Sequence, residues 1–133
     1  MEAFALVILI AAGLWLVGVA VLMALRPRYC LHLFEKMSAN LGRSNWRLQF
    51  TEQALRILAG VALIVRAPAS KLPLAFEIGG WLLVVSSVAI MIAPIRWHGA
   101  YGTWWVKRLK PWVIRALSPV PAVLGAGMIY AAV

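Results

Sequence analysis

Long apolar runs along the chain predict membrane-spanning helices. Residues 3–25 carry no charge and are followed by the basic, proline-containing sequence 26–28. Residues 73–94 are framed by prolines and carry Glu77 as their only charge. A helix needs about 20 mostly apolar residues to cross the hydrocarbon core of a bilayer. We therefore expect two spans at about 3–25 and 73–94.

Two further apolar runs are less regular. The run at about 46–66 has an uninterrupted apolar core only from 57 to 65, so it crosses a membrane only with Arg56 inside the span. In the run at about 111–133, 13 residues remain from Pro121 onward, too few to cross alone at about 1.5 Å per residue. We expect this helix to begin near residue 111 and to kink at its prolines. Entry of the tail without crossing is the alternative.

The charges orient these four spans. The chain has 13 Lys and Arg residues against four Asp and Glu, a net charge of +9. Five of the basic residues lie in the loop 26–47 and five in the loop 95–115, whereas the middle loop holds Arg66 and Lys71. Basic residues of short loops stay in the cytoplasm. We therefore expect a single transmembrane domain over 1–133 in a bacterial-type inner membrane, with loops 26–47 and 95–115 cytoplasmic and both termini outside. Membrane topology accounts for the basic charge, so no nucleic-acid partner is expected.

Both cytoplasmic loops have the pattern of amphipathic helices that lie on the membrane surface. In loop 26–47, apolar residues recur at helical spacing from Cys30 to Leu41. In loop 95–115, aromatic residues fall on one side of a helix and basic residues follow them. An aromatic belt in contact with lipid is the favoured interpretation, and a docking platform or ligand-stacking site is the alternative. The expected lipid contacts are Trp97, Tyr101, Trp104, Trp105, Lys107, Arg108, Lys110 and Trp112.

The two halves of the chain resemble one another weakly. Trp15 and the basic segment that follows the first span align with Trp81 and the segment that follows the span 73–94. The segment 54–58 around Arg56 aligns with the segment 113–117 around Arg115. Each half would be a span, an interfacial helix and a returning span, an arrangement seen in transporters. The expected fold is therefore an all-α membrane protein with four transmembrane helices. Apolar helices also match by chance, so duplication into two tandem hairpins stays open.

Arg56 is the costliest residue in the chain if 46–66 spans, because it then lies about 15 Å from either end of the helix. An intramembrane charge normally has a partner and marks a candidate site. Glu52 lies one turn earlier, where it can pair with Arg56. A structural arginine neutralised by Glu52 is the favoured interpretation, and a polar crevice that holds an anionic headgroup or carboxylate is the alternative. The candidate ligand-binding residues are Arg56, Glu52, Gln49, Gln53, Ser86 and Ser87.

Catalytic and metal-binding signals are weak. His32 and His98 are weak haem ligand candidates, because both lie in loops beyond the spans rather than on facing helices. Cys30 has no second cysteine as a partner, and we expect it to pack as a small apolar residue. The four Glu residues are scattered, so paired carboxylates for acid–base catalysis are missing. We expect no enzyme and no metal site.

The sequence leaves three functions open. The first is a non-catalytic membrane protein, either an accessory subunit of a larger complex or a binder of anionic lipid. The second is a small oligomeric transporter or flippase for an anionic substrate that uses Arg56. The third is a redox subunit that binds haem or quinone. Expected partners are membrane lipids with anionic headgroups, and further copies of the chain or a larger membrane complex.

Overall fold

The computed structural model describes the backbone of residues 1–42, 46–93 and 95–133, and all their side chains except those of 38–42, 46, 48, 95–96 and 98–99. The described residues form α-helices and one short 3₁₀ helix. In chain order they are α1 (Glu2–Leu25), α2 (Pro27–Gly42), α3 (Trp46–Arg66), η1 (Ala67–Ala69), α4 (Pro73–Ile92), α5 (Ile95–Arg108), α6 (Pro111–Leu117) and α7 (Pro119–Ala132). The expected all-α class is confirmed.

Proline sets several of the helix boundaries. Four of the α-helices begin at a proline, where the missing backbone N–H costs nothing because the first turn has no acceptor for it. α1 ends at Leu25, and Arg26 leaves the helical conformation with φ −134° and ψ 65° before Pro27 opens α2. α4 ends at Ile92, two residues before the expected boundary at 94.

The last apolar run begins at Pro111, as the sequence predicts, and is interrupted at its prolines. α6 and α7 meet at Ser118, whose backbone N–H and hydroxyl both donate to the carbonyl oxygen of Arg115, at 3.2 and 2.7 Å. Pro119 has no N–H to donate to this carbonyl, so Ser118 takes the place of the lost helical bond. The two segments together form a 22-residue helix, Pro111–Ala132.

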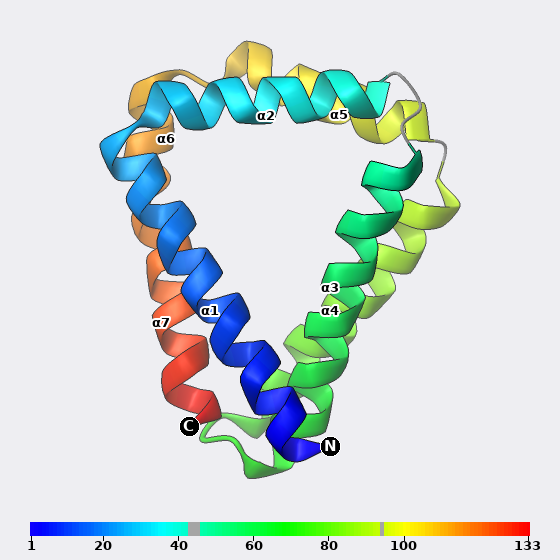
Figure 1. Ribbon diagram of the computed structural model, residues 1–133, viewed down its shortest axis with the longest axis vertical. Coiled ribbons are helices and arrows are strands. Elements are labelled where there is room, and N and C mark those ends of the chain that lie inside the picture. The colour runs from blue at the N-terminus through cyan, green and yellow to red at the C-terminus, as the bar shows by residue number, and fades with distance from the viewer. Residues whose placement is uncertain (43–45, 94) are drawn as a thin grey trace.

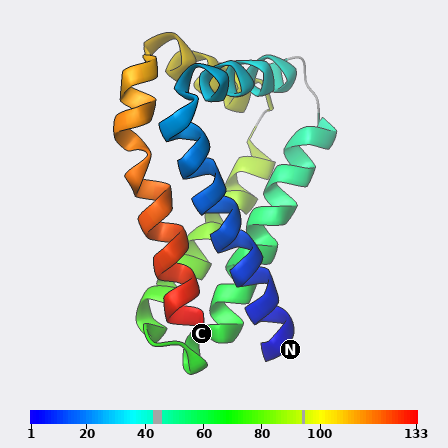
Figure 2. The same ribbon diagram turned by 60° about the vertical axis from the view of Figure 1, so that its left-hand side comes forward.

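The long helices form two antiparallel pairs. Figure 1 shows α1 beside α7 and α3 beside α4, with the two pairs converging at the end where both chain termini lie. The pairs diverge toward the opposite end, where α2 and α5 pack against each other and lie across the ends of the long helices. Figure 2 shows the same layer from another direction. The two loop helices predicted to lie on a membrane surface therefore occupy one end of the molecule.

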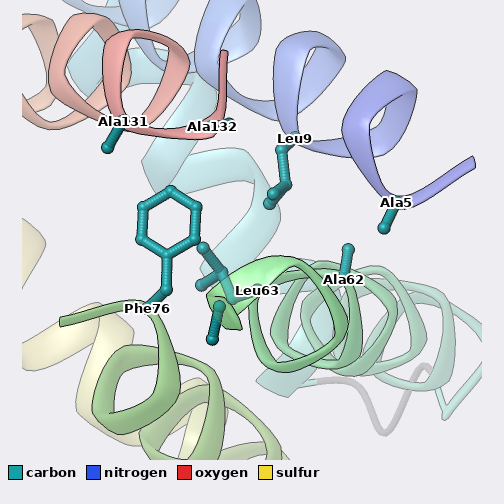
Figure 3. Packing of buried hydrophobic residues seen from close by; sticks show 8 residues of the cluster. Ala5, Leu9, Ala62, Leu63, Phe76, Ala131 and Ala132 are labelled. Carbon is teal, nitrogen blue, oxygen red and sulfur yellow. The ribbon is translucent and has the colours of Figure 1, made fainter. Parts of the chain in front are cut away.

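The apolar core lies at the converging end. It consists of buried residues from both helix pairs and from η1, listed in full as Ala5, Leu9, Ala62, Leu63, Ala67, Phe76, Ala131 and Ala132. Figure 3 shows Ala5 and Leu9 of α1 directed toward α3, and Phe76 of α4 directed toward the end of α7. Most of these side chains are alanine, which lets the helices approach closely.

The loop between the two halves is fastened to the end of α7. The backbone N–H of Lys71 donates to the carbonyl oxygen of Ala131 at 2.9 Å, and its ammonium group donates to that of Tyr130 at 3.1 Å. Arg66 donates from Nε to the carbonyl oxygen of Ala132 at 3.1 Å. The last carbonyl groups of a helix have no N–H donor within the helix. The hydrogen bonds from Lys71 and Arg66 therefore supply donors to these carbonyl groups at the C-terminus of α7.

Matching contacts occur in the two helix pairs. In one pair, Gly13 of α1 crosses Gly125 of α7, and in the other Gly80 of α4 crosses Gly60 of α3. A Cβ atom added to any of these four glycines would lie under 3.0 Å from the carbonyl oxygen of its partner glycine. The four backbones therefore approach one another in the same way in both pairs, and only glycine fits there.

A second matching contact corrects the sequence alignment of the halves. Arg115 Nε donates to the carbonyl oxygen of Ala24 near the end of α1 at 3.0 Å, and Gln49 Nε2 donates to that of Ile90 near the end of α4 at 3.3 Å. Arg115 thus corresponds in position to Gln49. The sequence comparison of Arg115 with Arg56 is wrong by two turns of helix, because apolar helices align with many registers.

Three of the described helices are long and apolar enough to cross a membrane: α1, α4 and the continuous segment Pro111–Ala132. α3 has a similar length of 21 residues but is more polar, because its N-terminal half carries Gln49, Glu52, Gln53 and Arg56. The chain is accordingly a helical protein of the multi-pass membrane class.

Candidate functional site

The predicted ion pair on α3 is present. The guanidinium of Arg56 donates to the carboxylate of Glu52 across one helical turn, with a distance of 2.9 Å between Nη2 and Oε1. The side chain of Arg56 is 44% exposed and that of Glu52 23%. The pair thus lies on the surface of α3 rather than within a closed cavity, and its charges neutralise each other.

Two glutamines of α3 are buried against α4 on a neighbouring face of the helix. Gln53 is fully buried at 0% exposure and Gln49 is 7% exposed. Ser87 of α4 is also fully buried, and the antiparallel register set by Gly60 with Gly80 and Gln49 with Ile90 places it level with Gln53. The structure therefore gathers three of the six candidate residues in the α3–α4 interface.

This buried polar group is only partly satisfied. Gln49 uses its amide nitrogen on the Ile90 carbonyl, but its Oε1 has no hydrogen-bond partner. Among the described residues, neither the nitrogen nor the oxygen of the Gln53 amide has one, and the hydroxyl of Ser87 has none. An unpaired buried amide costs about 1–3 kcal/mol by mutational measures. Such atoms are unusual in a folded protein and mark a place where water or another polar group would bind.

Ser86 does not join this group. Its side chain is exposed, and its hydroxyl donates to the carbonyl oxygen of Leu83 on its own helix at 3.1 Å. The adjacent serines of α4 thus point to different surroundings, because consecutive residues of a helix are 100° apart. The six candidate residues form an exposed ion pair, a buried polar interface and an isolated serine.

The aromatic residues of the third loop are exposed and stack on one another. Trp104 and Trp105 meet edge to face with their ring centroids 5.0 Å apart, and Tyr101 meets Trp105 at 6.2 Å. The guanidinium of Arg108 lies 3.8 Å from the centroid of the Trp104 ring. Trp97, Lys107 and Lys110 are exposed as well. We refer to Trp97, Tyr101, Trp104, Trp105, Lys107 and Arg108 as the α5 belt.

Trp112 does not belong to the α5 belt. α5 ends at Arg108, and Trp112 lies in α6 beyond the break at Leu109 and Lys110. The prediction that it shares one helical side with Trp97 and Trp105 is therefore wrong. Pro111 is the physical reason, since its ring cannot continue α5. Trp112 is nevertheless 68% exposed.

The weak redox candidates are not brought together by any described contact. His32 is exposed on α2, and the side chain of His98 lies outside the described residues. Among the side chains that are described, no three His, Cys, Asp or Glu residues are grouped to hold a metal ion. Cys30 is half-buried on α2, and burial raises the pKa of its thiol above the ordinary value. This thiol is accordingly protonated and poorly nucleophilic near neutral pH.

A cavity of about 650 Å³ lies at the junction of α1, α2 and α6. Arg26, Arg28 and Arg115 line it together with Tyr29 and Trp112. Sequence reasoning counted these arginines among the basic residues of two separate cytoplasmic loops, and so did not predict that they share a cavity. The only sequence signal was that each lies at the cytoplasmic end of an expected span.

A second cavity of about 470 Å³ lies along α4, lined by Glu77, Trp81 and neighbouring apolar residues. All of its lining residues come from this one helix. Neither this cavity nor the larger one is lined by the candidate residues of α3.

Comparison with known proteins adds no family to this description. No family model matches the chain, and neither a curated protein nor a solved structure is significantly similar to it.

Proposed function

We propose that the chain is a non-catalytic inner-membrane protein that crosses the membrane four times and binds anionic lipid headgroups at its cytoplasmic surface. The observation that carries this proposal is the layer formed by α2 and α5 across one end of both helix pairs (Figure 1). Aromatic side chains with adjacent lysine and arginine are suited to the headgroup region.

The packing of α3 supports its crossing of the membrane. α3 lies antiparallel beside α4, from Gln49 next to Ile90 to Gly60 next to Gly80. The loop after α3 is bonded to the end of α7 through Lys71. If α1, α4 and α7 span, the two ends of α3 lie at opposite membrane surfaces. The matching contacts of the two helix pairs support an arrangement as two tandem hairpins.

The distribution of basic residues favours the α2–α5 end as the lipid-binding surface. Arg66 and Lys71, at the opposite end, both donate to carbonyl oxygens of α7. Most of the remaining described cations lie on α2, on α5 or at the helix ends next to them: Arg26, Arg28, Lys36, Arg47, Lys107, Arg108, Lys110 and Arg115. Positive residues near a membrane surface attract anionic lipids by about 1 kcal/mol each.

The apolar face of α2 also supports a place at the membrane surface. Leu33, Phe34 and Met37 recur at helical spacing and are 36–42% exposed, while His32 and Lys36 lie on the other side of the helix. Apolar residues left exposed on one side of a surface helix are covered by acyl chains when that helix lies at the lipid interface.

Lipid retention tests this function. The protein is reconstituted in nanodiscs of equimolar phosphatidylglycerol and phosphatidylcholine, extracted in mild detergent, and its bound lipids are counted by native mass spectrometry. We expect phosphatidylglycerol to exceed its bulk share, and the excess to shrink as salt screens the charges. Retention in the bulk ratio at low salt contradicts the proposal.

A transporter for an anionic substrate is the second candidate. It is favoured by the Glu52–Arg56 pair in the middle of α3, next to the unpartnered amide of Gln53. Ligand-dependent stabilisation that is lost in Arg56→Gln and retained in Lys36→Gln would favour transport. An accessory subunit would instead copurify with foreign chains, and a haem-binding subunit would show a Soret band.

A further inference from the structure

The cavity at the junction of α1, α2 and α6 has an unbalanced charge. Arg26, Arg28 and Arg115 line it, and among the described residues none of the three forms an ion pair with an acidic side chain. The like charges of neighbouring arginines repel one another, and an anion bound near them offsets this repulsion. The positive charge of these arginines is therefore not balanced by an acidic side chain among the described residues.

The three arginines come from different elements that the fold brings together. Arg115 extends from α6 to donate to the carbonyl oxygen of Ala24 at 3.0 Å, which holds its side chain against the end of α1. Arg26 occupies the break between α1 and α2, and Arg28 lies in the first turn of α2. The N-terminus of α2 carries backbone N–H groups without helical acceptors, and it adds a partial positive charge on the same side.

The remaining walls are apolar or aromatic. Leu25 and Trp112 line the cavity, and Tyr29 contributes a ring with a hydroxyl group. Trp112 and Tyr29 are 68% and 50% exposed. A site lined by both cationic and apolar side chains suits a ligand with a charged head and a hydrocarbon part. Aromatic residues of this kind are enriched where acyl chains meet headgroups.

We propose that this cavity, between Arg26, Arg28 and Arg115, is a discrete binding site for one phosphate group of an anionic phospholipid. Arginine suits this role because its planar guanidinium donates two parallel hydrogen bonds to phosphate oxygens. The proposal rests on the proposed function and adds a single defined site to it. A soluble phosphate offers the same oxygen atoms, so the experiment separates the two sources.

The test compares Arg26→Gln/Arg28→Gln with the wild type in nanodiscs of equimolar phosphatidylglycerol and phosphatidylcholine. Neither arginine side chain bonds to another helix among the described contacts, so the double variant should fold, and circular dichroism checks this. Native mass spectrometry measures the fraction of protein molecules that still carry one bound phosphatidylglycerol, the last lipid to be retained. We expect at least about a tenfold loss in occupancy, since hydrogen bonds to charged groups are lost. Lys71→Gln removes one charge from the opposite end of the protein, outside the proposed lipid-binding surface, and should retain the lipid.

Two further arms complete the design. Arg26→Lys/Arg28→Lys keeps the charge but loses the guanidinium, and should retain less lipid than the wild type and more than the glutamine variant. Inorganic phosphate at 10 mM, a level chosen for the assay, should not displace the lipid. Displacement would assign the site to a soluble phosphate and would overturn the proposal that the bound phosphate group belongs to a lipid. Equal retention by wild type and the glutamine variant overturns this site alone. If the wild type itself retains phosphatidylglycerol only in its bulk ratio, the proposed function is overturned as well.

Discussion

Gly60 and Gly80 cross with their backbones in contact. A Cβ atom on Gly60 would lie 2.8 Å from the carbonyl oxygen of Gly80, and one on Gly80 would lie 2.6 Å from that of Gly60. These approaches are shorter than any that a side chain tolerates without a shift of the helices. The absence of side chains at this crossing lets the backbones of α3 and α4 approach each other closely.

Substitution of these glycines is expected to separate the helices. Gly60→Ala should destabilise the folded protein by about 1–3 kcal/mol, the usual cost of overpacking. Unfolding in mixed detergent micelles, followed by circular dichroism, measures this change. Gly18→Ala is the matched control, because nothing lies within 4 Å of the position of its added Cβ. Equal effects of the two substitutions would contradict the close crossing.

The buried amide of Gln53 predicts a gain of stability on its removal. Both of its polar atoms are unpaired, so Gln53→Leu should stabilise the folded state by about 1–3 kcal/mol. The same detergent unfolding experiment measures the gain. Gln49→Leu is the comparison and should gain less, because it also loses the hydrogen bond to the Ile90 carbonyl. A loss of stability in Gln53→Leu would show that the amide has a bound partner such as water.

The Glu52–Arg56 pair predicts coupling between its two members. Glu52→Gln leaves an unpaired cation in the middle of α3, and Arg56→Gln leaves an unpaired carboxylate. The double variant should be more stable than the sum of the two single effects by about 0.6 kcal/mol, the average measured for hydrogen-bonded pairs within membranes. A double-mutant cycle on unfolding free energies gives this value. Simple additivity would show that the pair contributes nothing.

Cys30 predicts slow thiol chemistry with a defined pH dependence. Burial disfavours the thiolate and raises the pKa of Cys30, so at pH 8 alkylation should be slower in the folded protein than in the denatured chain. The unfolded thiol ionises first as pH rises through its ordinary pKa of about 8.5. The stability contributed by the protonated thiol is therefore fully present below that pH and is lost as pH rises toward the folded pKa. Equal alkylation rates in the folded and denatured states would contradict this assignment.

The sequence predicts the helices well because their signals are local. Long apolar runs define α1 and α4, prolines mark where α2, α4, α6 and α7 begin, and helical spacing identifies the loop helices. The i, i+4 distance from Glu52 to Arg56 is likewise local and is confirmed by the structure. These features need no knowledge of which helices are neighbours.

The features that sequence reasoning missed depend on helix pairing. The cavity between Arg28 and Arg115 forms only because α6 packs near the start of α2, and the separation of Ser86 from Ser87 depends on where α3 lies. The alignment of Arg115 with Arg56 failed for the same reason, since residue similarity alone does not fix the register of an apolar helix. The glycine crossings and the hydrogen bonds to the Ala24 and Ile90 carbonyls establish that register.

The four-span topology is the central claim, and thiol accessibility in intact cells tests it most directly. Single cysteines are placed at Lys36, Ser70 and Lys107 in a Cys30→Ser background and labelled with a membrane-impermeant maleimide. We predict that the cysteine at Ser70 is labelled in intact cells, whereas those at Lys36 and Lys107 react only after the membrane is opened. Labelling at Lys107 with protection at both Lys36 and Ser70 would mean that α3 does not cross, and would contradict the account.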